Sequence, residues 1–245
     1  LLDIREELLA KVQDVTSANL KNVMARTSAT SQRRDKPVQR SVRLKAFTDA
    51  VRRDFHVVVI GSSTGGPPAV QSIFSAIQEE IPVAFAVAQH MPPDFTRAFA
   101  ERLNRFSALN IREAKNGDIV RPGEVLIAPG GKNLEFFPKG ADVIAKVSEP
   151  KGHQRYLPSV DILFSSAASV FGARLLGVVL TGMGNDGAMG VHAVKQNGGS
   201  AFAEAEESCV VFGMPKEAIA TGLVDRIVPL PLVCKEILRH CGCGR

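Results

Sequence analysis

The chain has 245 residues, 45% of them hydrophobic, and a mean hydropathy of +0.05, values that suit one folded domain with a substantial core. Its apolar runs are shorter than the ~20 residues that span a bilayer, so no membrane insertion is expected. The formal charge of +5 is uneven, because residues 1–53 hold 12 of the 30 Lys and Arg but only 6 of the 25 Asp and Glu. The remainder is close to neutral and shows no basic stripe with interleaved aromatics, which argues against a nucleic-acid partner.

The first part of the chain has the pattern of a helix followed by a linker. Residues 1–25 carry apolar side chains at helical spacing, and residues 27–40 are polar and charged. The sequence starts with Leu1, and no signal-peptide pattern precedes the folded part, so we expect a piece of a longer cytoplasmic protein. We divide the chain into an N-terminal helix and basic linker over 1–54 and a folded domain over 55–240.

From residue 55 onward, apolar strands alternate with amphipathic helices. Uninterrupted apolar runs predict strands at 55–60, 83–89, 124–128, 174–181, 200–203 and 224–228. Helical patterns fall at 68–79, 94–106, 159–171, 187–197, 214–221 and 231–239. This alternation predicts an α/β fold with a doubly wound, mostly parallel sheet and helices on both faces. Around residues 111–147, short apolar pieces broken by glycine turns predict a small β-hairpin insertion.

Three loops that follow predicted strands carry chemically active side chains. Ser62 and Ser63 lie in the glycine-rich turn 61–66, His90 opens the second loop, and Asp186 lies in the third. Because the carboxyl ends of parallel strands share one edge of a sheet, these loops are expected to converge. A base activates a serine, histidine can be that base, and aspartate can orient it. The order Ser, His, Asp differs from that of α/β-hydrolases, which disfavours their fold.

Each of these features has another interpretation. The turn 61–66 can hold a phosphate at a helix start, although it lacks both the G-x-G-x-x-G pattern and the Walker lysine. His90 can be an ordinary strand-end residue, and Asp186 can be a helix N-cap. A non-catalytic phosphate- or nucleotide-binding module therefore stands as the alternative to a serine hydrolase. An interaction protein acting through its basic linker is a third possibility.

The four cysteines, Cys209, Cys234, Cys241 and Cys243, are too few for a disulfide framework in a chain of this length. Three of them lie close to His240, but the spacing lacks the second C-x-x-C half of a zinc site. We expect buried or terminal thiols in a reducing compartment, with no metal and no cofactor.

The blocks VIGSSTGG, QHMP, APGGK, PSVDILF, TGMGNDGAMG and VFGMPKEAI follow one another along the chain. In that order they resemble the catalytic domain of chemotaxis protein-glutamate methylesterases, over about residues 55–232. The resemblance implies hydrolysis of glutamate γ-methyl esters on the cytoplasmic helices of chemoreceptors, with release of methanol. In some members it implies deamidation of receptor glutamines. It also implies a preceding receiver domain, phosphorylated by an upstream histidine kinase, whose last helix residues 1–17 resemble.

Carried over by position, the resemblance implies Ser63 as the nucleophile, His90 as the base and Asp186 as its orienting acid. It implies that Thr64 and Met183 lie beside the reacting centre, with the Met183 backbone N–H as an oxyanion donor.

The chain departs from the family pattern at three positions outside this triad. Asn133 stands where histidine is common, Leu157 where arginine often precedes PSVD, and Glu204 where glutamine is frequent. We expect these changes to affect substrate contacts rather than the reaction. Close to the His90 loop, Arg97 and Arg102 either steer the protein towards acidic receptor helices or only solvate a helix face.

Overall fold

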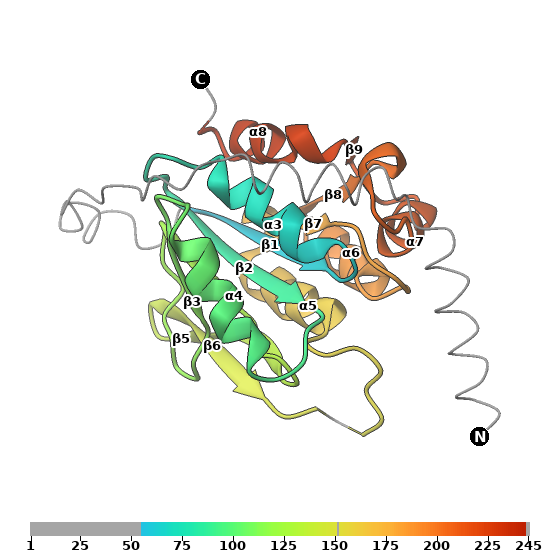
Figure 1. Ribbon diagram of the computed structural model, residues 1–245. Helices are drawn as coiled ribbons and strands as arrows, with labels where there is room; N and C mark the ends of the chain where they lie inside the picture. Colours follow the sequence, from blue (N-terminus) through green and yellow to red (C-terminus); the bar gives the residue numbers. More distant parts are fainter. Residues whose placement is uncertain (1–54, 151, 244–245) are drawn as a thin grey trace.

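The structure is a computed structural model that describes residues 55–150 and 152–243 (Figure 1), so the helix and linker expected over 1–54 lie outside it. The strands of its main sheet are β1 (His56–Ser62), β2 (Val83–Gln89), β3 (Asn110–Glu113), β4 (Glu124–Ile127), β7 (Leu175–Val179), β8 (Ser200–Glu204) and β9 (Arg226–Val228). They lie in the order β3-β4-β2-β1-β7-β8-β9, and every neighbouring pair is parallel. The predicted doubly wound α/β fold is confirmed.

Helices cover both faces of this sheet. The helices are α3 (Gly66–Ser75), α4 (Phe95–Asn104), α5 (Val160–Phe171), α6 (Ala188–Gln196), α7 (Met214–Ala220) and α8 (Leu230–His240), with short 3-10 turns at Gly172–Arg174 and Glu206–Ser208. Val58 and Ile60 of β1 pack in one core with α3, α4 and α8, whereas Val57 and Val59 pack in the other with α5, α6 and α7. Because successive side chains of β1 enter opposite cores, its apolar run has to be continuous. None of the helices in the described ranges is long and apolar enough to cross a membrane.

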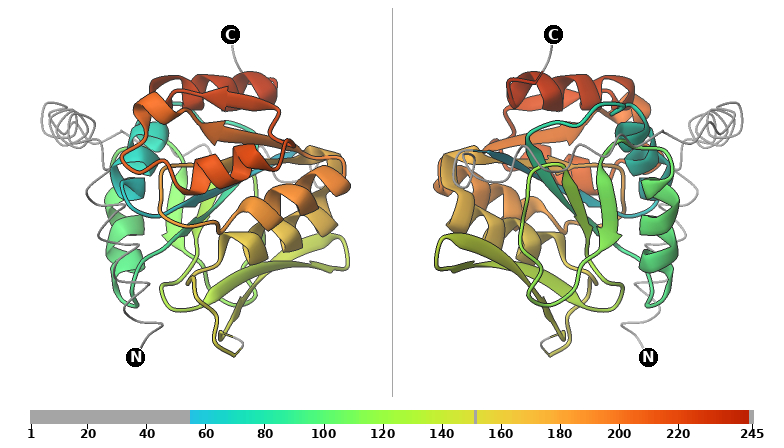
Figure 2. Two further views of the ribbon diagram at one scale, coloured as in Figure 1. Left: turned by 90° about the vertical axis from the view of Figure 1, so that its right-hand side faces the viewer. Right: turned by 90° about the vertical axis from the view of Figure 1, so that its left-hand side faces the viewer.

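The predicted hairpin insertion consists of two antiparallel strands, β5 (Asn133–Lys139) and β6 (Asp142–Ser148). Figure 2 shows this hairpin lying along α5, where Leu134 and Phe136 join the core that contains that helix. The hairpin covers fewer residues than the predicted range 111–147, because β3 and β4, which lie in the first part of that range, belong to the main sheet. In β3 only Ile111 is buried, so four residues at the sheet edge carry too little apolar pattern to predict a strand.

The position of β1 in the sheet decides where a site can form. From β1 the chain proceeds to β2 on one side, and it later returns to β7 on the other side of β1. In open α/β sheets, ligands bind beyond the carboxyl ends of the strands at such a reversal. The loops that follow β1, β2 and β7 all lie at this place.

Phe164 of α5 fills the space between the sheet and α6. Its side chain is fully buried. A Cβ atom added to Gly177 of β7 would lie 2.9 Å from the ring, and one added to Gly190 of α6 would lie 2.7 Å from the Phe164 Cβ. The two glycines therefore allow the helix and the sheet to approach this ring closely.

We expect Phe164→Ala to lower the free energy of unfolding by about 3–5 kcal/mol, because it leaves a cavity that the close-packed neighbours cannot fill. Urea denaturation measures the loss. The control is Ser165→Ala on the exposed side of the same helix, expected within about 0.5 kcal/mol of the parent. Equal stability of the two variants would contradict this packing.

Candidate functional site

Ser63 follows β1 directly and precedes the first turn of α3. Its backbone N–H donates to the Thr181 carbonyl at 3.1 Å, and its carbonyl accepts from the Gly66 N–H at 2.8 Å. The neighbouring Ser62 is fully buried, with its hydroxyl donating to Gln89 Oε1 at 2.7 Å. Ser63 is partly exposed, so it is the accessible serine of the pair. Its place at the start of a helix puts backbone N–H groups nearby, which favour negative charge.

The parallel pairing of β1 with β2 brings His90 beside Ser63. Ser62 is in register with Gln89, so the next residue of each strand lies at the same sheet edge. The backbone N–H of His90 donates to the Ser62 carbonyl at 3.0 Å, and the side-chain Nε2 of Gln89 donates to the Ser63 carbonyl at 3.0 Å. Backbone and buried amide contacts thus fix the spacing of the two residues.

Asp186, in the loop after β7, completes a buried pair with His90. Its Oδ2 lies 2.8 Å from His90 Nε2, and its side chain is only 2% exposed. The carboxylate also accepts the backbone N–H groups of Val160 at 2.7 Å and Asp161 at 2.9 Å, and the Ser159 hydroxyl at 3.2 Å. Burial alone would raise the pKa of Asp186, but the hydrogen bonds from His90 and from the two N–H groups, with the charge of His90, bring that pKa below its usual value. The carboxylate is therefore charged at neutral pH.

This contact determines which nitrogen of His90 is available as a base. A neutral imidazole that donates from Nε2 to a carboxylate carries its lone pair on Nδ1. A direct bond from the Ser63 hydroxyl to His90 is not among the hydrogen bonds of residues 55–150 and 152–243, and such bonds often tighten only with substrate bound.

The loop after β7, which carries Met183, packs against the turn that carries Ser63 and Thr64. A Cβ on Gly182 would lie 2.8 Å from the Ser63 Cβ and 2.4 Å from the Met214 sulfur, so only glycine allows this approach. The Thr181 hydroxyl donates to the Thr64 carbonyl at 3.0 Å. The residues expected beside Ser63 are thus on the two segments that meet there.

The comparisons with known proteins agree with one another. The CheB methylesterase family matches residues 58–237. This chain belongs to the CheB methylesterase family. It is 50% identical over 252 residues to protein-glutamate methylesterase/protein-glutamine glutaminase 3 of Geobacter sulfurreducens, covering 99% of this chain and 68% of that protein. It is 52% identical over 174 residues to protein-glutamate methylesterase/protein-glutamine glutaminase 1 of Myxococcus xanthus, covering 71% of this chain and 50% of that protein.

Among solved structures, the crystal structure of the Thermotoga maritima CheB methylesterase catalytic domain is similar, with a TM-score of 0.74 and 38% identity. The similarity covers 76% of this chain and 99% of that one. At this identity, both the sequence and the fold place residues 58–237 in the CheB methylesterase family.

In this CheB methylesterase domain, two aspartates cap each other's helices. Asp186 precedes α6 and accepts N–H groups from the first turn of α5, as described above. Asp161 lies in that first turn and accepts the N–H groups of Gly187 at 2.8 Å and Gly190 at 2.6 Å at the start of α6. The interpretation of Asp186 as the N-cap of its own helix is wrong, because Gly187 is the N-cap of α6 and Ser159 is that of α5; Asp186 instead accepts backbone N–H groups of α5 across the loop, together with its contact to His90.

The two aspartates have opposite pKa shifts. Burial raises the pKa of Asp161 to about 6, and the Asp186 charge adds to that rise, while the N–H groups of Gly190 and Gly187 oppose it. At neutral pH both groups are mainly ionised. The charge on Asp161 therefore opposes folding, whereas the charge on Asp186 favours it.

The departures from the family pattern lie mostly inside the protein. Asn133 is 2% exposed and forms two hydrogen bonds with Gln154, and Glu204 is fully buried, with Oε2 accepting the Thr181 N–H at 2.9 Å. Both side chains hold neighbouring backbone, the N–H of Ser159 and that of Thr181, so an effect on substrate contacts stays a prediction and has to act through that backbone. Leu157 is half-buried immediately before Pro158.

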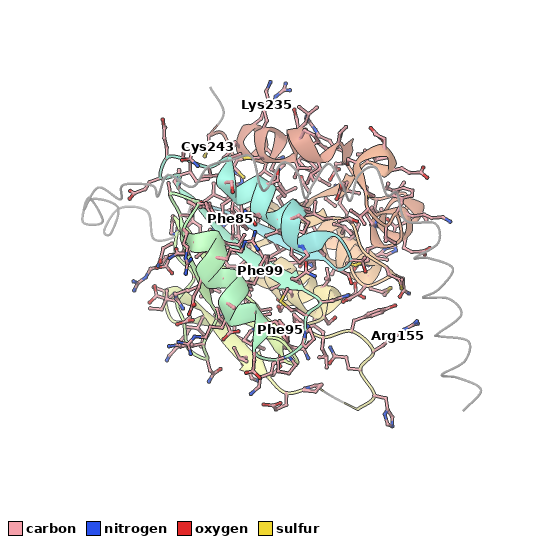
Figure 3. The ribbon with its side chains drawn as sticks, viewed as in Figure 1. Phe85, Phe95, Phe99, Arg155, Lys235 and Cys243 are labelled. Atoms are coloured by element: carbon pink, nitrogen blue, oxygen red, sulfur yellow. The ribbon has the colours of Figure 1, made fainter. Side chains whose placement is uncertain are left out.

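Sequence reasoning missed Tyr156, the single tyrosine of the chain. Its ring stacks on the His90 ring, with centroids 5.2 Å apart and planes 10° from parallel. It comes from the loop 152–158 before α5, from which Arg155 extends in Figure 3. A half-exposed aromatic residue in an irregular loop shows no helical or strand periodicity, so the sequence pattern did not indicate it. Its position just before the LPSVD block was the one sequence feature that pointed to the site.

The arginines expected near the site lie on α4, whose first residue, Phe95, is 63% exposed (Figure 3). Arg97 is 78% exposed and pairs with Glu101 through Nε at 3.2 Å, and Arg102 is exposed one turn further along. The geometry is compatible with either interpretation of these arginines, solvation or steering.

His56, His240 and two of the cysteines lie at the other end of the sheet and on α8. His56 begins β1 at the opposite edge of the sheet, with its ring 6.1 Å from that of His240. Burial raises the pKa of the Cys234 thiol to about 11 and that of Cys241 to about 12. Within the described part of the chain, no group of three or more His, Cys, Asp or Glu side chains is arranged to hold a metal.

We expect Asp161→Asn to gain stability relative to the parent as the pH rises from 4 to 7. With its pKa raised to about 6, folded Asp161 holds its proton more tightly than the unfolded chain does, so its contribution to stability falls across this range. Asparagine keeps an oxygen for the two N–H groups and removes that dependence. Urea unfolding at pH 4, 5.5 and 7 measures the difference, and a constant difference across the three pH values would contradict the raised pKa of Asp161.

Proposed function

We propose that this domain is a protein-glutamate methylesterase in which Ser63, His90 and Asp186 form the catalytic triad. One observation carries the proposal: a buried Asp186–His90 pair lies at the strand edge where the accessible Ser63 follows the neighbouring strand. Membership of the CheB methylesterase family supports the same reaction. The substrates are glutamate γ-methyl esters on chemoreceptor helices.

In the first half of the reaction, His90 Nδ1 takes the proton of Ser63 while Oγ attacks the ester carbonyl carbon. The charge of Asp186 stabilises the resulting imidazolium. The oxyanion is held by the Met183 N–H and the start of α3, beside Thr64. When the tetrahedral intermediate collapses, the C–O bond to the methoxy group breaks, and His90 returns its proton to form methanol.

In the second half, His90 removes a proton from water, which attacks the acyl group on Ser63. Collapse of this second intermediate breaks the ester to Ser63 and returns the proton to its hydroxyl, leaving a free glutamate. With glutamine as substrate, the same steps release ammonia in place of methanol. The names of the Geobacter sulfurreducens and Myxococcus xanthus relatives include both activities.

The whole protein is proposed to carry a receiver domain ahead of this one, with residues 1–54 as its last helix and a basic linker. Its partners are then the receptor helices and the histidine kinase that phosphorylates the receiver. The upstream coding sequence tests this directly, and a region without a receiver's phosphate-accepting aspartate would overturn it.

We expect Ser63→Ala to lower methanol release from a methylated receptor cytoplasmic fragment by roughly 10³-fold or more, since no other group forms the acyl intermediate. The matched control is Ser62→Ala, which removes the adjacent buried hydroxyl and leaves Ser63 intact. It is expected to lose stability and less than about tenfold in rate. A loss of less than about tenfold in Ser63→Ala, no larger than that in Ser62→Ala, would exclude Ser63 as the nucleophile.

We propose that Arg97 and Arg102 steer the domain towards acidic receptor helices. Reversing both to glutamate should lower kcat/KM on the receptor fragment several-fold at low salt, and the loss should shrink at ~0.5 M salt, where charges are screened. The control reverses Lys235 and Arg239, exposed on α8, and changes the net charge equally. Equal kcat/KM values for the two double variants at low salt would contradict steering and show that the α4 arginines only solvate the helix face.

A further inference from the structure

Tyr156 covers the catalytic base from a segment that contributes no member of the proposed triad. Its ring lies parallel to the His90 imidazole, as described above, and the His90 side chain is only 12% exposed. The Tyr156 hydroxyl donates to Asn185 Oδ1 at 3.3 Å, next to Asp186. One side chain therefore touches both the base and the loop that carries the orienting acid.

The loop after β7 is shaped to receive this ring. Gly184 has a φ of +92°, in the region that favours glycine, and a Cβ there would lie 2.3 Å from the Tyr156 hydroxyl oxygen. The close approach of ring and loop thus depends on a glycine in the family's TGMGNDG block.

A pair of amide side chains holds the segment that carries Tyr156. Asn133 Nδ2 donates to Gln154 Oε1 at 2.9 Å, and Gln154 Nε2 donates to Asn133 Oδ1 at 2.8 Å. Gln154 Nε2 also donates to the Tyr156 carbonyl at 2.9 Å, and the Ser159 N–H donates to Asn133 Oδ1 at 3.2 Å. This amide clamp, Asn133 with Gln154, connects the hairpin strand β5 to the backbone of Tyr156 and to the start of α5.

We propose that Tyr156 is a positioning residue for His90, held in place by the amide clamp. The proposal rests on the proposed esterase function. The stacked ring restricts rotation of the imidazole about its side-chain bonds, so that Nε2 stays on Asp186 and Nδ1 stays towards Ser63. The π-face of the ring also favours the imidazolium that forms when His90 takes the serine proton.

Three charged groups lie around this stack. Asp186 contacts it directly, and Asp161 lies beyond Asp186 on α5. The Arg155 guanidinium lies 5.3 Å from the centre of the Tyr156 ring. Asp186 holds one nitrogen of the imidazole, and the parallel Tyr156 ring adds a restriction on the plane of the imidazole that none of the three charges supplies.

The test compares Tyr156→Phe, which keeps the ring, with Tyr156→Leu, which removes it. We expect Tyr156→Leu to lower kcat for methanol release by about tenfold or more with KM nearly unchanged, because a misoriented base slows chemistry. Tyr156→Phe should stay within about threefold of the parent. A rise in KM with unchanged kcat in Tyr156→Leu would show a substrate contact and overturn the proposal.

Two further readouts do not require receptor substrate. Labelling of Ser63 by a small fluorophosphonate should slow in Tyr156→Leu and not in Tyr156→Phe. Nitrogen-15 spectra of His90 should show a single Nε2–H tautomer in the parent and in Tyr156→Phe, and averaged signals in Tyr156→Leu. Unchanged spectra and labelling in Tyr156→Leu would overturn the positioning role. If the parent hydrolyses no ester while the spectra still differ between the parent and Tyr156→Leu as expected, the proposed function fails and the positioning role of Tyr156 stands.

The clamp is tested by Gln154→Ala, Asn133→Ala and the double variant. Each single change breaks the same pair of hydrogen bonds. The labelling rate of Ser63 in the double variant should therefore equal that of the more slowly labelled single variant. His153→Ala, an exposed change in the same loop, is the control and should match the parent. Labelling by all three clamp variants at the parent rate would remove the clamp from the proposal.

Discussion

The rest of the site depends on the hydrogen bonds that the buried carboxylate of Asp186 accepts. It is almost fully buried, and it accepts hydrogen bonds from His90, from two backbone N–H groups of α5 and from the Ser159 hydroxyl. An ionised carboxylate in the interior is costly unless such donors surround it. Because those donors come from separate segments, stabilising this one charge also fixes the loops after β2 and β7 against the start of α5.

The parallel sheet supplies the remaining precision through backbone contacts. Ser62 and Gln89 are in register, and the Ser63 N–H is bonded to the Thr181 carbonyl, so three strand ends hold the serine and the histidine. Sites built on strands and helix starts are more precisely held than sites built on free loops. Gly182 adds a close approach that no larger residue allows.

Around this centre, buried polar residues have hydrogen-bond partners. Asn133 at the start of β5 is satisfied by a reciprocal bond with Gln154. Buried polar groups need such partners, so a change at one position has to be matched at another. The same amide pair holds the segment whose Tyr156 ring stacks on His90, so its packing also affects the candidate site.

Local patterns in the sequence determined the α/β fold, the three loops of the site and the side chains that they carry, because apolar periodicity and glycine turns are properties of short segments. The edge strand β3 was missed, since four residues with one buried side chain show no periodicity. Only the tertiary structure decided the burial that separates Ser62 from Ser63, the reciprocal caps of Asp161 and Asp186, and the stacking of Tyr156. Each depends on contacts between distant segments, as with His90 and Asp186, which are 96 residues apart in the chain.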